Sequence, residues 1–139
     1  MKKYLNRSLF YAILAMAAGV FFREFTKYMD FEGRTYLSKV HPHIFVLGMF
    51  FFLIIYLLSL NLDFEKSPKI DRHLLYYNCG LLQTFIMFMI RGIFQVLENE
   101  LSKGQSAMIS GLAGLGHSLL AVALILVLLD IGKMEKFNK

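Results

Sequence analysis

The sequence has no tryptophan, one cysteine and only two prolines among its 139 residues, and these shortages exclude several kinds of structure. A single cysteine, Cys79, cannot form a disulfide within the chain, and the motif C-x-x-C-H for covalent haem attachment is absent. Charged residues are also few, at 18%, whereas hydrophobic residues make up 57%. Together with a mean hydropathy of +0.54, this composition excludes an ordinary soluble domain.

Long apolar runs take the place of a soluble core. A helix needs about 20 mostly apolar residues to cross a bilayer. Four segments have this character, and they predict spans over residues 8–25, 41–60, 74–97 and 107–129. Because the polar connections between them are short, successive spans are expected to be antiparallel. The sequence therefore predicts an all-α, integral membrane four-helix bundle, a single domain over residues 1–139 that lies in a lipid bilayer.

The distribution of positive charge predicts the orientation of these spans. The N-terminus, the connection after the second span and the C-terminus hold nine basic residues: Lys2, Lys3, Arg7, Lys66, Lys69, Arg72, Lys133, Lys136 and Lys139. The other two connections hold five: Arg23, Lys27, Arg34, Lys39 and Lys103. This bias predicts that both termini are cytoplasmic. It also accounts for the net charge of +5, which therefore gives no indication of nucleic-acid binding.

The N-terminal run has the basic start and apolar centre of a signal peptide. The residues after it are still apolar and aromatic, however, and no soluble domain follows. A retained first helix explains this pattern better than a cleaved signal. We therefore expect a multi-pass protein of the bacterial cytoplasmic membrane.

Each predicted span has a face that does not suit lipid. One side of the first span carries Ala12, Ala15 and Gly19 at helical spacing, followed by Arg23, and one side of the fourth carries Ser110, Gly114, Ser118 and Ala121. A semi-polar stripe runs along the third span (Gly80, Thr84, Met87, Arg91 and Gln95). Small faces let helices approach closely in lipid, so helix packing is the simplest explanation of the first two.

Ionisable residues within the spans are the candidate functional groups, because a charge at the bilayer centre costs at least about 2.5–3.5 kcal/mol. The candidates are Arg23, His41, His43, Arg91 and His117. Topology places all of them in the outer half of the membrane, with His117 about 15 Å down its helix. His73 lies at the inner start of the third span, where we expect it to meet water.

The stretch HPH at residues 41–43 places two histidines around a proline. At 3.6 residues per turn they point about 200° apart, so one small metal ion is hard to hold with both. Pro42 suits a helix start, which would leave His41 just before the helix and His43 within it. A copper or zinc site that uses His41 or His43 together with His117 is the weaker alternative.

Haem suits this set of residues better, because its iron needs only one or two axial imidazoles. His43 is the preferred ligand, and His41 and His117 are the other candidates. Arg91 and Arg23 lie at a depth where they can meet the propionates of a haem. No catalytic constellation is present, and we do not expect the chain to be an enzyme by itself.

Each candidate also has a purely structural explanation. A lone histidine in a membrane helix often forms a hydrogen bond with a neighbouring helix, which applies to His117. His41 can simply lie at the level of the lipid headgroups. Arg91 can pair with Glu98 or Glu24 instead of a propionate.

The stretch HPHIFVLGMFFFLI, residues 41–54, resembles the second helix of the four-helix unit in haem–copper oxidase subunit I and in related nitric-oxide-response membrane proteins. The resemblance implies haem b, with His43 as the low-spin haem ligand and His41 at the position of a second haem's ligand. It also implies that Arg91 holds propionates. The histidines of the copper centre have no match here, so oxygen reduction and proton pumping are not implied. The chain also looks like a family of small uncharacterised four-helix bacterial membrane proteins.

Oxidase subunit I arranges twelve helices in three arcs of four, so the resemblance implies that a lone four-helix chain assembles as a homotrimer. The expected role is electron transfer, gas or haem sensing, or haem handling, with a redox partner that the sequence does not name. The rival hypothesis is a non-haem accessory protein or a transporter of small solutes. It predicts no bound chromophore and tolerance of substitution at His43.

Overall fold

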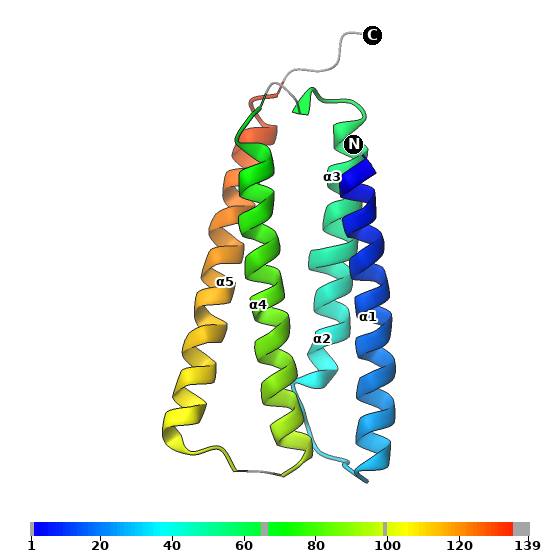
Figure 1. Cartoon of the computed structure of the whole chain (residues 1–139), viewed down its shortest axis with the longest axis vertical. Helices are drawn as coiled ribbons and strands as arrows, with labels where there is room; N and C mark the ends of the chain where they lie inside the picture. Colours follow the sequence, from blue (N-terminus) through cyan, green and yellow to red (C-terminus); the bar gives the residue numbers. More distant parts are fainter. Residues whose placement is uncertain (1, 65–66, 99, 135–139) are drawn as a thin grey trace.

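The computed structural model describes residues 2–64, 67–98 and 100–134 (Figure 1). Its helices are α1 (Lys2–Tyr28), α2 (Leu37–His43), the π-helix η1 (Ile44–Phe50), α3 (Phe51–Ser59), α4 (Ile70–Val96) and α5 (Lys103–Ile131). α2, η1 and α3 follow one another without a break and form one helix of 23 residues. Within the described part, four helices are long and apolar enough to cross a membrane, as the sequence predicts.

The four long helices form an open layer of antiparallel neighbours. α5 packs mainly against α4, α4 meets the α2–α3 helix, and α1 packs along that helix on its other side. Figure 1 shows α5 and α1 at opposite edges of the layer. We call the end with the 29–36 and 97–102 connections the distal end, and the end where α1 begins and α5 finishes the proximal end. The cytoplasmic orientation stays a prediction, and three of its residues, Lys66, Lys136 and Lys139, lie outside the described ones.

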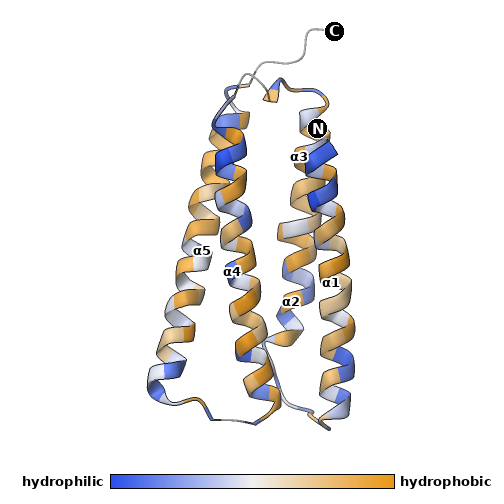
Figure 2. Ribbon diagram, in the orientation of Figure 1, coloured by the Kyte–Doolittle hydropathy of each residue, from blue (hydrophilic) through white to orange (hydrophobic). Residues whose placement is uncertain are grey.

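Hydrophobic residues occupy most of each helix, and the hydrophilic ones gather toward the helix ends (Figure 2). The apolar side chains are not confined to the core. Ile13 is 62% exposed and Leu115 is 64% exposed. A soluble monomer rarely exposes such extensive apolar surface, whereas a bilayer covers it. The composition of the outer faces therefore indicates a multi-pass membrane protein.

The backbones of α4 and α5 approach each other closely. A Cβ atom added to Gly80 would lie 2.7 Å from the backbone nitrogen of Leu120 and 3.0 Å from the carbonyl oxygen of Gly116. Glycine at these positions lets the two backbones meet, as small residues do in lipid. The stripe predicted on the third span thus faces α5 at Gly80 and Thr84, both of which are buried.

Most of the small-residue face predicted for the fourth span lies outside the contact between α5 and α4. Ser110, Gly114, Ser118 and Ala121 are all exposed. The buried face of α5 consists of Ile109, Gly116, Leu120, Ala123 and Val127. Helix packing of the small-residue face therefore stays a prediction, because α4 approaches α5 on the other side, at Gly116 and Leu120.

Helix α2 begins at Leu37 and not at Pro42, so the expectation that His41 precedes the helix was wrong. The hydroxyl of Thr35 donates to the carbonyl oxygen of Gly92 at 2.9 Å and also accepts from the backbone N–H of Leu37 at 3.2 Å. This contact fixes the start of α2 on α4. Pro42 therefore lies inside the helix, where its missing N–H and its ring disturb the hydrogen-bond ladder.

The π-helix η1 follows directly after His43 and shifts the register of the helix. Two hydroxyl groups from neighbouring helices donate to its carbonyl oxygens. Ser8 of α1 donates to Met49 at 2.9 Å, and Tyr77 of α4 donates to Leu47 at 2.8 Å. The π-helix is thus held by side chains on both of its flanks, one turn below the two histidines.

Candidate functional site

His41 is fixed against α1. Its Nδ1 lies 2.9 Å from the carbonyl oxygen of Ala15, and its ring meets Phe45 edge-on, with the ring centroids 4.7 Å apart. A Cβ atom at Gly19 would lie 2.9 Å from the same Nδ1. The small face predicted on the first span therefore accommodates an imidazole at Ala15 and Gly19.

His43 and His117 both contact the ring of Phe88 on α4. The ring centroid of His43 lies 5.2 Å from that of Phe88, and the centroid of His117 lies 5.7 Å from it. Phe88 is thus shared by a histidine from α2 and one from α5. His41 and His43 face different helices, α1 and α4, in agreement with their predicted angular separation.

The imidazoles of His41, His43 and His117 each leave the same ring nitrogen, Nε2, without a hydrogen bond in the described part of the chain. Nδ1 of His43 lies 2.8 Å from the carbonyl oxygen of Lys39, and Nδ1 of His117 lies 2.8 Å from that of Ala113. A carbonyl oxygen can only accept, so each Nδ1 carries the proton and Nε2 of the neutral ring keeps its lone pair. No Nε2 of these three histidines is hydrogen-bonded to a residue that the structure describes. Metal-binding histidines are commonly held by this type of bond at the other ring nitrogen.

The histidines share a layer but do not converge. Among residues 2–64, 67–98 and 100–134, no three His, Cys, Asp or Glu side chains are placed to hold a metal ion. The copper or zinc alternative thus has no three-ligand site within the described part of one chain. His117 is also deeper than expected, because α5 starts at Lys103 and puts this histidine fourteen residues, or about 21 Å, along the helix.

The early start of α5 has a local cause that the sequence contains. Ser102 accepts a hydrogen bond from the backbone N–H of Gln105, and the Gln105 side chain accepts one from the backbone N–H of Ser102. This reciprocal pair is a capping box, of which the pattern S-x-x-Q is the sequence signature.

Arg91 binds hydroxyl groups rather than a carboxylate. Its Nη2 lies 2.8 Å from the Ser110 hydroxyl and 3.3 Å from that of Ser106, and its guanidinium lies 5.5 Å from the ring centroid of Tyr36. Neither of the expected acidic partners, Glu24 or Glu98, pairs with it in the described part of the chain. Beside it is a pocket of about 280 Å³, lined also by Tyr36 and Gln95. The charge of Arg91 is therefore available to an anion.

Arg23 does not join this group. Its side chain is 81% exposed, and its Nε lies 3.7 Å from a carboxylate oxygen of Glu24, the next residue of the same helix. An exposed pair at this distance holds its partners weakly. The structure thus gives Arg91, and not Arg23, a defined position near the histidine layer.

His73 and Asp130 form a largely buried pair that sequence reasoning missed. Nδ1 of His73 lies 2.6 Å from Oδ2 of Asp130, and the two side chains are only 15% and 12% exposed. His73 is thus only partly exposed, because most of its side chain is covered where it meets Asp130. The sequence could have indicated this pair, because Asp130 lies near the end of α5 and His73 near the start of α4, at the same end of the antiparallel helices.

A family model described as "Protein of unknown function (DUF2871)" matches residues 1–134. The chain belongs to this family. The match agrees with the predicted likeness to small uncharacterised four-helix membrane proteins, and its description assigns no activity or cofactor. No curated protein and no solved structure matches the chain. The likeness to haem–copper oxidase subunit I therefore stays a prediction from residues 41–54.

Proposed function

We propose that the protein is a b-type haem-binding protein of the bacterial cytoplasmic membrane, with both termini in the cytoplasm, that serves in electron transfer, gas or haem sensing, or haem handling. The observation that carries this proposal is that His43 and His117 have the same hydrogen bonding and the same aromatic neighbour. Each holds Nδ1 on a backbone carbonyl and leaves Nε2 free, and both contact Phe88. Nε2 with its lone pair is the atom that an axial haem ligand uses.

The surroundings of these histidines suit a flat apolar ring. Gly114 precedes His117 by three residues and so lies on the same side of α5, and Gly111 is a further turn away. A Cβ atom at either glycine would meet nothing within 4 Å, so the space beside them is open. Arg91 keeps N–H groups that the serines do not use, which suits a propionate. Bound haem would supply an iron that exchanges single electrons or binds a gas.

Phe88 bears on how the iron would be ligated. Its ring packs against both His43 and His117, which occupies the space between them. Two axial ligands from one chain would thus require Phe88 to leave its place. We infer that each histidine faces a haem on its open side and that a second ligand, where there is one, comes from another copy of the chain.

An assembly of several copies is supported by two complementary surfaces at the opposite edges of the helix layer. α1 exposes a ridge of large apolar residues, Leu9, Ile13, Met16 and Val20. α5 exposes a groove of small residues, Ala107, Gly111, Gly114, Ser118 and Ala121. Both sets repeat at alternating steps of four and three residues, which is the spacing of knobs-into-holes packing. We call these surfaces the α1 ridge and the α5 groove.

The α1 ridge and the α5 groove also match in height. Lys3 of α1 and Asp130 of α5 contact residues 71 and 73 of α4, so they lie at one level near the proximal end. α1 and α5 are antiparallel. Met16 lies thirteen residues from Lys3 toward the distal end, and His117 lies thirteen residues from Asp130 in the same direction. At 1.5 Å per residue both lie about 20 Å deeper. The two surfaces are different, so their contact is head-to-tail and can close into a ring, and we propose a homotrimer.

The absorption spectrum of the detergent-purified protein, expressed with ample haem, tests the proposal. We expect a Soret band that is lost or strongly reduced in His43→Ala and in His117→Ala. The control is His73→Gln, which alters a histidine that is bound to Asp130 and lies outside the site. A colourless wild-type protein that is folded by circular dichroism contradicts haem binding.

The rival proposal, a non-haem accessory protein or transporter, is favoured by one specific observation. His41 binds the carbonyl oxygen of Ala15 on another helix, which is a packing role that needs no cofactor. This proposal predicts that His43→Ala and His117→Ala leave both the spectrum and the fold unchanged. The same spectra therefore decide between the two.

A further inference from the structure

The segment 29–36 returns from α1 at the distal end before α2 begins. Figure 1 shows that α2 starts well inside the distal ends of α1 and α4. Its start is fixed there by Thr35, which is buried and donates to the carbonyl oxygen of Gly92 in α4. A recess therefore remains between the distal ends of α1 and α4, and the chain that leads into α2 forms its floor.

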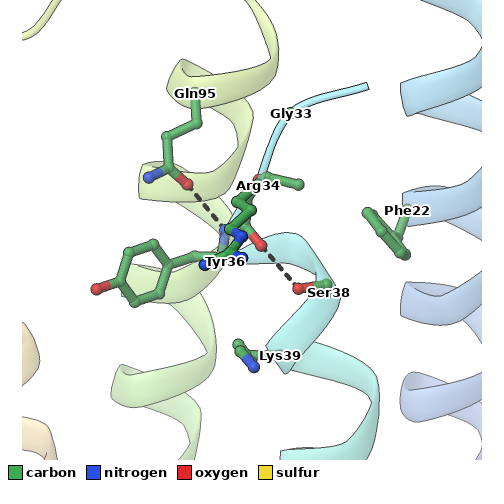
Figure 3. Close-up of a pocket in the computed structure, with 8 residues that line it drawn as sticks. Phe22, Gly33, Arg34, Tyr36, Ser38, Lys39 and Gln95 are labelled. Atoms are coloured by element: carbon green, nitrogen blue, oxygen red, sulfur yellow. Dashed lines mark hydrogen bonds between the residues drawn. The ribbon is translucent and has the colours of Figure 1, made fainter. Parts of the chain in front are cut away.

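This recess is a pocket of about 530 Å³, which lies in the size range of small-molecule sites. It is lined by Phe22, Gly33, Arg34, Thr35, Tyr36, Ser38, Lys39 and Gln95. Figure 3 shows Phe22 on one side and the other labelled residues across from it. The Gln95 side-chain oxygen accepts from the backbone N–H of Tyr36 at 2.8 Å, which fixes the wall between α4 and the entering chain.

The charge in the pocket has one sign. Arg34 and Lys39 line it, and no acidic residue does. Neither of these cations pairs with a carboxylate among the residues that the structure describes. Tyr36 and Gln95 also line the adjoining pocket that contains Arg91. Three cations thus lie around two neighbouring pockets.

We propose that this pocket binds a phosphate group, with Arg34 and Lys39 as its cationic ligands. Arginine and lysine are the usual partners of phosphate, and the guanidinium of arginine can donate two parallel hydrogen bonds. The amide N–H groups of Gln95 have no partner in the described part of the chain and can donate as well. Phe22 gives the pocket an apolar side on a lipid-facing helix. A phosphate can come from a phospholipid headgroup or from a soluble phosphate compound.

The proposal is tested with the full-length protein in detergent, with and without the double substitution Arg34→Gln, Lys39→Gln. Native mass spectrometry measures retained phosphatidylglycerol and phosphatidylcholine, and calorimetry measures binding of phenyl phosphate. Arg23→Gln, Lys27→Gln is the matched control, because it removes two exposed cations near the distal end that do not line the pocket. Both positions of the test variant are exposed, and equal thermal melts confirm that it folds.

We expect the wild type and the control variant to bind equally well. The test variant should bind about tenfold or more weakly, because it loses charge-assisted hydrogen bonds. If phosphatidylglycerol is retained and phenyl phosphate does not bind, the site takes a lipid. If phenyl phosphate binds and phosphatidylglycerol is not retained, the site takes a soluble ligand. Absence of both, or equal losses in the test and control variants, overturns the proposal. The measurement does not depend on haem, so its outcome is separate from that of the proposed function.

Discussion

The imidazole of His73 and the carboxylate of Asp130 join α4 to α5 at the proximal end, with Nδ1 and Oδ2 2.6 Å apart. Both side chains are largely buried. A polar group in this position is stabilising only while its partner is present, because an unpaired one cannot recover its bonds to water. The contact therefore fixes both the register of the two helices and their heights in the layer.

Asp130→Ala should destabilise the protein by about 1–3 kcal/mol, since it leaves the imidazole without its acceptor. Asp130→Asn should cost less, because its side-chain oxygen still accepts. The measurement is unfolding in detergent, followed by circular dichroism. The control is Glu32→Ala in the exposed distal connection. A double-mutant cycle with His73→Ala should show a coupling energy, and additive effects would mean that the pair contributes nothing.

Tyr77→Phe should weaken the π-helix, because it removes the hydroxyl that donates to the carbonyl oxygen of Leu47. Hydrogen bonds between membrane helices contribute about 0.6 kcal/mol on average and about 1.7 at most, which is the expected loss in stability. Tyr76→Phe is the matched control, since Tyr76 is the preceding residue and is 43% exposed. Equal melting temperatures for the two variants would show that the hydroxyl of Tyr77 does not support η1.

Gly80→Ala should separate α4 from α5, because its new Cβ would lie 2.7 Å from a backbone nitrogen of Leu120 that cannot move alone. Overpacking of this type costs about 1–3 kcal/mol. Gly104→Ala is the control, because a Cβ there meets nothing within 4 Å and alanine favours the helix. The difference between the two unfolding midpoints measures the effect, and a Gly80→Ala protein as stable as the control would refute the close approach.

The sequence predicted the parts of the fold that depend on length and hydropathy. Four apolar runs define four helices, and short connections make them antiparallel. The helix ends were less accurate where local hydrogen bonds decide them, as at Ser102 and Thr35. Pro42 was placed at a helix start by its usual preference, but the contact of Thr35, just before α2, with Gly92 of α4 starts the helix earlier.

The candidate site was predicted as a set of residues but not as an arrangement. Spacing separated His41 from His43, and the structure places them against different helices. Spacing alone could not show that Phe88 lies between His43 and His117, because that depends on how three helices pack. For the same reason the serine partners of Arg91 were missed, since they lie on another helix, α5.

The α5 groove gives a prediction for the assembly. Gly111→Leu or Gly114→Leu should leave each chain folded, because either side chain enters open space within one copy. In a homotrimer the same change would fill the groove that receives the α1 ridge, and the complex should dissociate to monomers. Native mass measurement or a cross-linking ladder reports the oligomeric state, and circular dichroism reports the fold.

The matched control for the groove is Gly104→Leu, which also enters open space but lies at the start of α5, outside the groove. Met16→Ala on the ridge should weaken the same complex from the other side, since a knob is lost instead of a hole filled. If haem is shared between copies, dissociation by Met16→Ala should also change the Soret band, since this variant leaves His117 and the space beside Gly114 unaltered. A wild-type protein that is monomeric in mild detergent and in nanodiscs, with a spectrum that Met16→Ala does not alter, would contradict both the trimer and a haem shared across it.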